Sequence, residues 1–182
     1  VHRKSYITEG ATCHYTWYVP QNVEGLFQVI SNSGQNVVTR LDRMFDEGLY
    51  WHGNEPCHQI AYLYNKAGAP WKTQQRIHHI LNTEYNDTPG GLSGNDDAGQ
   101  MSAWYMFSAI GFYPVCPATP YYYIGTPSFD KVTFNLENGR KFEIVAEGVD
   151  DENFYIQQVD LNGKSGYYLS HDDLLKGGKL SF

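Results

Sequence analysis

Two neighbouring carboxylates in a glycine-rich loop are the sharpest chemical feature of the sequence. Residues 90–100 read GGLSGNDDAGQ and place Asp96 and Asp97 immediately before an apolar stretch. A carboxylate at a helix N-terminus is stabilised by the first-turn N–H groups and the helix dipole, by ~0.3–1 kcal/mol. One carboxylate suffices for such a cap, so we expect at least one of the two acids to have a functional role. The loop lacks the regular Asp/Asn spacing and the closing Glu of an EF-hand.

A second segment, residues 50–59, also places an acid where a helix is expected to begin. Its sequence YWHGNEPCHQ sets Asn54 and Glu55 side by side. Amide and carboxylate oxygens are hard donors that suit calcium rather than a transition metal. His52 and His58 raise zinc as a rival, but no H-E-x-x-H motif is present and the two histidines lie on either side of a proline. We therefore expect calcium at Asn54 and Glu55.

The third acidic segment, residues 6–17, contains Glu9 before another expected helix. A lone Glu in this position is more often an N-terminal charge than a catalyst. Acids at three loop-to-helix junctions meet at one face if successive helices alternate in direction. Glycoside hydrolysis needs a protonated acid and an ionised base, and an inverting enzyme separates them by about 6.5–9.5 Å to admit a water. Separate segments can supply that gap, whereas the adjacent Asp96 and Asp97 cannot be assumed to be the pair.

The elements that must position these acids are predicted to be short helices separated by Gly, Pro and Asn. We place them at residues 12–18, 23–31, 36–47, 56–67, 70–85 and 99–110. Asn22 and Asn36 are expected N-caps. The expected left-handed positions at helix C-termini are Gly34, Gly48, Gly68 and Gly111. Residues 101–110 are apolar on nearly every face, which predicts an inner helix surrounded by other helices.

After Pro120 the apolar period changes from helical to alternating, which predicts antiparallel strands. Asn138-Gly139 is a strong hairpin signal between a strand carrying residues 132, 134 and 136 and a partner carrying residues 142 and 144. A second hairpin is expected at Asn162-Gly163, between residues 156–159 and 167–169, before a terminal strand at 180–182. The chain is therefore expected to be α+β, with helices in residues 1–115 and strands in residues 116–182.

Composition excludes several classes of partner. A net charge of -7 without any Lys/Arg run argues against nucleic acid and against an anionic membrane surface. No apolar run has the length of a transmembrane helix or forms a signal-peptide core, so no membrane insertion is expected. The three cysteines, with no C-x-x-C pair, predict neither a disulfide framework nor a zinc site. Because the sequence begins directly in the acidic segment, we expect a piece of a longer polypeptide.

Three motifs carry a resemblance to a known family. The blocks GNEPCHQ at 53–59, GLSGNDDAGQMSAWY at 91–105 and GFYP at 111–114 resemble signature blocks of glycoside hydrolase family 92. Residues 117–127 and 173–180 are similar to that family's C-terminal part. Members are much longer, with an N-terminal β-sandwich and an (α/α)6 catalytic domain. The resemblance implies that residues 1–115 are part of the helical toroid, that residues 116–182 form a C-terminal antiparallel strand region, and that the N-terminal half of the polypeptide is missing.

The resemblance also implies an activity and its residues. The family removes terminal α-mannose from glycans with inversion, by acid/base catalysis, using a calcium ion that holds vicinal sugar hydroxyls. Carried over by motif, Glu9 is the general acid and Asp97 the base that activates water. Asp96 is the less favoured candidate for the base. Asn54 and Glu55 correspond to residues at the calcium.

Two positions depart from the family pattern and bear on substrate binding. Trp51 and His52 stand where α-1,2-selective members have a His-Glu pair, so we expect them at the substrate and leave the linkage open. The sequence after Glu9 also differs from the family, which has Asn-Ala-Trp-Gln there. We expect the parent protein to be secreted, periplasmic or on the cell surface. An alternative is a non-catalytic fragment that binds carbohydrate or calcium, and the isolated chain is expected to be inactive.

Overall fold

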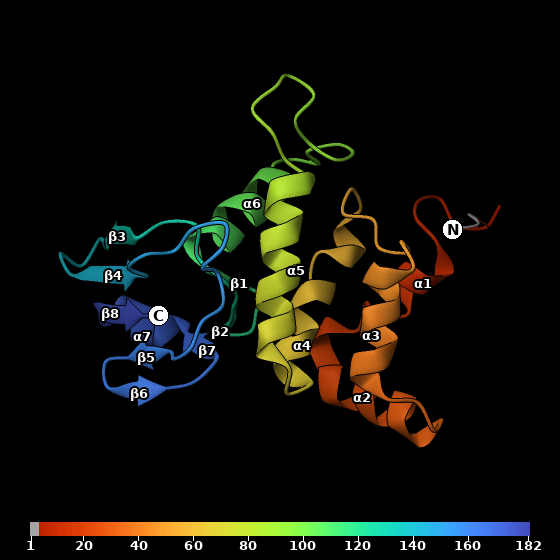
Figure 1. Cartoon of the computed structure of the whole chain (residues 1–182), viewed down its shortest axis with the longest axis horizontal. Coiled ribbons are helices and arrows are strands. Elements are labelled where there is room, and N and C mark those ends of the chain that lie inside the picture. The colour runs from red at the N-terminus through yellow and green to blue at the C-terminus, as the bar shows by residue number, and fades with distance from the viewer. Residues whose placement is uncertain (1–3) are drawn as a thin grey trace.

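The computed structural model describes residues 4–182. Most of its helices lie to one side of its strands, and the helix His171–Leu175 lies among the strands (Figure 1). Figure 1 shows α5 standing between the strands and the N-terminal helices α1, α2 and α3. The helices and 3-10 turns before the strands are α1 (Thr12–Tyr15), η1 (Pro20–Asn22), α2 (Val23–Asn32), α3 (Val37–Asp46), η2 (Glu55–Cys57), η3 (Ile60–Tyr62), α4 (Leu63–Lys66), α5 (Pro70–Thr83) and α6 (Gln100–Ile110).

The predicted helix ends are confirmed by their hydrogen bonds. Asn22 Oδ1 accepts from the N–H of Gly25 at 2.9 Å, and Asn36 Oδ1 accepts from the N–H of Thr39 at 2.9 Å. These contacts satisfy N–H groups that have no partner within the first turn of a helix. All of the expected C-terminal glycines have positive φ angles, between 64° and 114°: Gly34, Gly48, Gly68 and Gly111.

The single helix predicted over residues 56–67 is wrong, because the structure has η2, η3 and the short α4 there. In a continuous α-helix the carbonyl of His58 would accept from the N–H of Tyr62. Instead it accepts from the Trp104 indole Nε1 at 3.0 Å, and Tyr62 N–H donates to Gln59 O at 3.0 Å. A tertiary contact to α6 therefore replaces the local helical bond.

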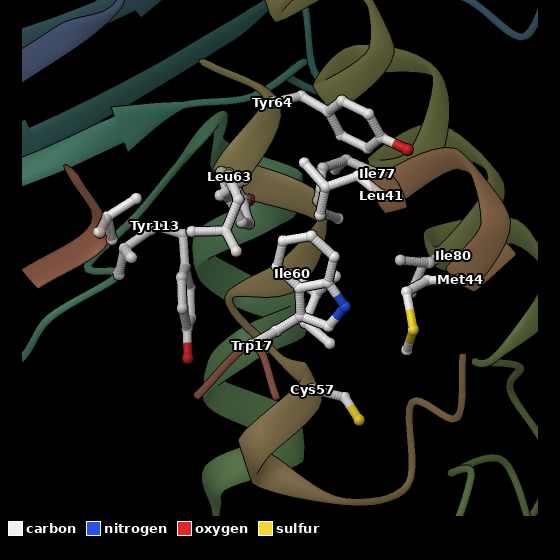
Figure 2. Close-up of a cluster of buried hydrophobic side chains, with 14 of the residues drawn as sticks. Trp17, Leu41, Met44, Cys57, Ile60, Leu63, Tyr64, Ile77, Ile80 and Tyr113 are labelled. Atoms are coloured by element: carbon white, nitrogen blue, oxygen red, sulfur yellow. The ribbon is translucent and has the colours of Figure 1, made fainter. Parts of the chain in front are cut away.

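The helical part is held by a core of side chains drawn from nearly all of its segments (Figure 2). The Trp17 indole is 2% exposed and lies beside Ile60 in Figure 2, while Leu41 and Ile77 join α3 to α5. Full burial of one such side chain contributes about 1.5–3 kcal/mol. Ile60 is fully buried within this core. It lies only a few residues after Asn54 and Glu55, so its burial anchors the segment that carries these two residues.

The strands form two sheets, one of three strands and one of five. One sheet has the order β1-β2-β7, with β1 (Phe112–Tyr113), β2 (Tyr121–Ile124) and β7 (Tyr168–Ser170). The other has the order β3-β4-β8-β5-β6, with β3 (Lys131–Asn135), β4 (Lys141–Val145), β5 (Asp160–Leu161), β6 (Lys164–Ser165) and β8 (Gly178–Ser181). Helix α7 (His171–Leu175) connects β7 to β8. The α+β class is thereby confirmed, and the toroid remains a prediction.

The first predicted hairpin is confirmed and the second only in part. Phe134 pairs with Phe142 across β3 and β4 in antiparallel register. The turn at Asn162-Gly163 joins β5 to β6, but the strand expected at 167–169 is β7, which pairs with β2 in the other sheet. Strand β8 pairs parallel to β4, so the strand region is not wholly antiparallel. Leu169 in β7 is fully buried in the hydrophobic core of the strand region. Burial of this side chain favours the pairing of β7 with β2.

Helix α6 is not enclosed on every side by the described residues. Its buried face carries Met101 and Trp104, which are 1% and 0% exposed. Tyr105 and Met106, which follow these residues on the helix, are 38% and 59% exposed. The prediction of an inner helix is therefore confirmed for one face only.

Candidate active site

Three carboxyl groups from distant segments come together near the start of α6. The carboxyl of Glu55 lies against that of Asp97, and the negative charge of Glu9 also acts on it. Burial is the main cause that raises the pKa of Glu55, followed by its contact with Asp97 and the negative charges of Asp97 and Glu9. Two carboxyl groups in contact hold either a shared proton or a cation between them. The expected convergence of the acidic segments is thus present.

Glycines allow these segments to approach so closely. A Cβ at Gly94 would lie 2.7 Å from the carbonyl oxygen of Gly53, and a Cβ at Gly53 would lie 2.9 Å from the Trp51 ring. A Cβ at Gly10 would lie 2.9 Å from Asn54 Nδ2. Separations of this kind are below normal contact distance, so a larger residue would push the acidic segments apart. The three loops therefore pack through backbone that carries no side chain.

The structure separates the roles of the two adjacent acids. Asp96 Oδ1 accepts from both the N–H and the hydroxyl of Ser102, at 3.0 and 2.9 Å, and so caps α6. Asp97 is exposed and has a φ of 46°, followed by Ala98 at 58° and Gly99 at 93°. A non-glycine residue in this left-handed region costs about 1–2 kcal/mol. The turn formed by these residues places the Asp97 carboxyl against Glu55 rather than on the helix terminus.

A cavity of about 640 Å³ opens beside Glu9, within the size range of small-molecule sites. Glu9 and Trp51 both line it, and the Trp51 side chain is 40% exposed. The floor is held by His14, whose Nε2 donates to Leu49 O at 2.7 Å and whose Nδ1 accepts from the N–H of Ala11 at 3.1 Å. Asn54, Glu55 and Asp97 do not line this cavity among the described residues.

His52, expected at the substrate, is fully buried, and both of its ring nitrogens are already hydrogen-bonded. The Tyr50 hydroxyl donates to Nδ1 at 2.7 Å, and Nε2 donates to the Tyr85 hydroxyl at 2.6 Å. Tyr85 in turn donates to Met101 O at 3.1 Å. Burial, followed by the nearby His58, lowers the pKa of His52 to about 2, so the ring is neutral. These consecutive hydrogen bonds connect the loop after α3 to the start of α6. They leave neither ring nitrogen of His52 available to a sugar.

His58, the other half of the zinc alternative, is also occupied by the fold. Its Nε2 donates to His52 O at 3.0 Å, and Gln100 Nε2 donates to its Nδ1 at 3.3 Å. Gln100 also donates to the Tyr113 hydroxyl at 3.1 Å. Burial lowers the pKa of His58 to about 4. Both histidines therefore use their ring nitrogens internally, which argues against the zinc alternative. No motif in the sequence marks Tyr50, Tyr85 or Gln100 as partners of these histidines.

The candidate calcium residues fit that ion by the chemistry of their donors. Asn54 is 3% exposed, and its Oδ1 is the side-chain atom able to bind calcium, whereas its Nδ2, which has no hydrogen-bond partner among the described residues, is a donor and cannot bind a cation. Its amide lies next to Glu55, whose carboxyl contacts Asp97. Calcium takes 6–8 oxygen ligands. Within residues 4–182, no group of three or more His, Cys, Asp or Glu side chains is arranged to hold a metal ion. These side chains would therefore supply only part of a calcium shell.

The chain is similar to proteins of one family. The model of the glycosyl hydrolase family 92 catalytic domain matches residues 2–182. An uncharacterized secreted glycosidase from Arthroderma benhamiae is 32% identical over 169 residues, which are 90% of this chain and 22% of that protein.

Solved structures give the same result. The family GH92 α-mannosidase BT3965 from Bacteroides thetaiotaomicron, in complex with mannoimidazole, has a TM-score of 0.89 and 44% identity over 97% of this chain. The family GH92 inverting mannosidase BT2199 from the same organism has a TM-score of 0.86 and 39% identity over 96% of this chain. The chain spans 25% and 27% of those two structures. No helix within residues 4–182 is long and apolar enough to cross a membrane. The chain belongs to glycoside hydrolase family 92 and corresponds to about a quarter of the length of these relatives.

Proposed function

We propose that the longer protein containing this chain is a calcium-dependent, inverting exo-α-mannosidase that removes terminal α-mannose from glycans. The observation that carries the proposal is that Glu9, on the wall of a cavity of about 640 Å³, lies near enough to the adjoining carboxyls of Glu55 and Asp97 for its charge to act on Glu55. The similar GH92 α-mannosidases, one of them named as inverting, support this reaction type. A relative described as secreted supports a location outside the cytoplasm, at the cell surface, in the periplasm or in the medium.

Glu9 and Asp97 divide the acid and base roles in this proposal. Glu9 lines the cavity and is exposed, so it can deliver a proton to the leaving oxygen of a bound mannoside. Asp97 is the member of the acidic pair that lies against Glu55 at the site, because Asp96 is engaged with Ser102. As a carboxylate it takes a proton from the attacking water. Since the two residues come from separate segments, the site can leave room for that water, as an inverting mechanism requires.

Asn54 and Glu55 would hold the calcium ion, and Trp51 would form the wall of the sugar site. When bound, calcium supplies positive charge that binds sugar hydroxyls and offsets the negative charge of the neighbouring acids. The partly exposed Trp51 indole can pack against the apolar face of a pyranose. Its position on the cavity wall is set by close contact with Gly53. His52 acts from behind this wall by holding Tyr50 and Tyr85 in place.

The test is Asp97→Asn in the full-length protein, with Asp96→Asn as the matched control. We expect Asp97→Asn to lower kcat by about a hundredfold or more with little change in KM, because general-base assistance acts in the transition state. Asp96→Asn keeps an acceptor oxygen for Ser102 and is expected to lower kcat by less than about tenfold. A rate for Asp97→Asn close to that of the wild type contradicts the assignment. NMR of the first-formed mannose should show the β anomer, and an initial α anomer contradicts inversion.

A further inference from the structure

Strands β2 and β7 display three tyrosines on one face of their sheet. Tyr121 and Tyr123 are two residues apart, so they share a face, while Tyr122 between them packs against the second core. Tyr168 is the register partner of Tyr123, and their rings meet edge to face at 4.8 Å. Tyr121 and Tyr168 are 53% and 38% exposed. The sheet therefore presents a row of aromatic rings that the core does not use completely.

These rings line a cavity of about 410 Å³ between the sheet and the start of α2, which we call the tyrosine cavity. Its volume is within the range of small-molecule sites. Gln21, Glu24 and Lys66 contribute its polar wall. None of the described residues that line the tyrosine cavity also lines the cavity of Glu9 and Trp51. It is thus a second concave site, made of different elements from the candidate active site.

The charges of the tyrosine cavity cancel. The Lys66 ammonium forms an ion pair with Glu24, and it also lies 5.7 Å from the centre of the Tyr168 ring. Mutual pairing leaves neither charge free to select an ionic ligand. The net charge of -7 on the whole chain further opposes phosphate groups and nucleic acid, although nucleobases also stack on aromatic rings. A neutral ligand fits this wall better than a charged one.

The hydroxyls of the three tyrosines are available for hydrogen bonding. Within residues 4–182, Tyr121, Tyr123 and Tyr168 make no hydrogen bond through their hydroxyls, whereas the Tyr122 hydroxyl on the opposite face bonds to His171 Nδ1 at 2.8 Å. A tyrosine ring offers an apolar face and a polar edge together. Pyranose rings have the complementary surface, with C–H groups on their faces and hydroxyls around their edges.

We propose that the tyrosine cavity binds a neutral oligosaccharide at a site separate from the candidate active site. The rings of Tyr121 and Tyr168 pack on pyranose faces, and the free tyrosine hydroxyls and Gln21 bond to sugar hydroxyls. Such a site holds a polymeric glycan on the protein without taking part in bond cleavage. Binding at this site does not depend on mannosidase activity. Only the choice of α-mannan as the first probe rests on the proposed function.

The experiment is affinity gel electrophoresis of the full-length protein in gels containing α-mannan or, in parallel, a neutral β-glucan. All proteins carry Asp97→Asn, so that the probe is not consumed if the proposed mechanism is correct. We expect retardation by at least one polymer, and a loss of apparent affinity of about fivefold or more in Tyr121→Ala and in Tyr168→Ala. Tyr168→Phe keeps the ring and loses only the hydroxyl, so it is expected to lose about two- to threefold, less than Tyr168→Ala. Tyr155→Ala removes a tyrosine of similar exposure outside the cavity and is the matched control.

Each outcome decides the proposal. Retardation by neither polymer, or equal retardation of Tyr121→Ala, Tyr168→Ala and Tyr155→Ala, overturns it. In the background with native Asp97, an unchanged kcat/KM of the tyrosine variants on an aryl α-mannoside shows that their fold is intact. If the protein has no mannosidase activity, thermal melting supplies that control, and binding still tests the tyrosine cavity alone. Loss of turnover and loss of glycan binding are therefore separate results.

Discussion

Removing the Asp96 carboxylate should destabilise the fold, although its neighbour Asp97 can be replaced at almost no cost. Asp96 Oδ1 accepts from the N–H and the hydroxyl of Ser102, in the first turn of α6. Loss of an N-terminal cap costs about 0.5–2 kcal/mol. Because two hydrogen bonds are lost together, we expect Asp96→Ala to lower the free energy of unfolding by about 1–2 kcal/mol.

Two further variants separate the parts of this effect. Asp96→Asn keeps an acceptor oxygen but loses the negative charge at the helix N-terminus, which is worth about 0.3–1 kcal/mol. Ser102→Ala removes the hydroxyl and leaves the backbone N–H bonded, so it should cost about 0.5–1.5 kcal/mol. Asp97→Asn removes one of two contacting carboxyls, and Asn tolerates a φ of 46° well. Its free energy of unfolding should stay within about 0.5 kcal/mol of the wild type.

Urea unfolding of the 182-residue chain, followed by tryptophan fluorescence, measures these differences. Trp104, one of four tryptophans, is fully buried in α6 and contributes to this signal. A double-mutant cycle between Asp96→Ala and Ser102→Ala should give a coupling energy of about 0.5 kcal/mol or more. If Asp96→Ala leaves stability unchanged, or if Asp97→Asn costs more than Asp96→Ala, then the division of the two acids into cap and catalyst is wrong.

Three further outcomes are expected. Calorimetry on the full-length protein should show calcium binding that Glu55→Ala weakens and the exposed Glu47→Ala does not, and equal affinities would remove Glu55 from the calcium site. The depressed pKa of His58, about 4 when folded against 6.5 unfolded, makes the unfolded chain bind the extra proton. As the pH falls from about 6.5 to 4, His58 should therefore contribute a loss of stability of up to about 1.4 kcal/mol per pH unit, in addition to a similar loss from His52, and His58→Gln should remove only the His58 part of the slope. Finally, the isolated chain should show no useful turnover of an aryl α-mannoside when it is assayed beside the full-length protein. A misplacement of catalytic groups by about 1 Å costs roughly a hundredfold in rate. Activity comparable to that of the full-length protein, and abolished by chelation, would refute this prediction.

Much of the local structure could be predicted from the sequence, because it depends on neighbouring residues. Asn22 and Asn36 cap helices through N–H groups only three residues away. The Asn138-Gly139 turn sets the register of β3 and β4 within the same short stretch. Family membership was also readable, since the motif blocks around Glu55 and Asp97 lie in continuous segments.

The tertiary structure decided what the acids and histidines can do. Asp96 and Asp97 are chemically identical, and only the left-handed turn after them directs one to Ser102 and the other to Glu55. In the same way, the family resemblance predicted that His52 would lie at the substrate. Its side chain is instead buried and hydrogen-bonded to Tyr85, far along the chain. Sequence patterns record spacing along one element. Burial and hydrogen-bond partners depend on elements that meet only after folding. For this reason the structure was needed to show that Asp96 bonds to Ser102 while Asp97 lies against Glu55, and that His52 is bonded within the fold.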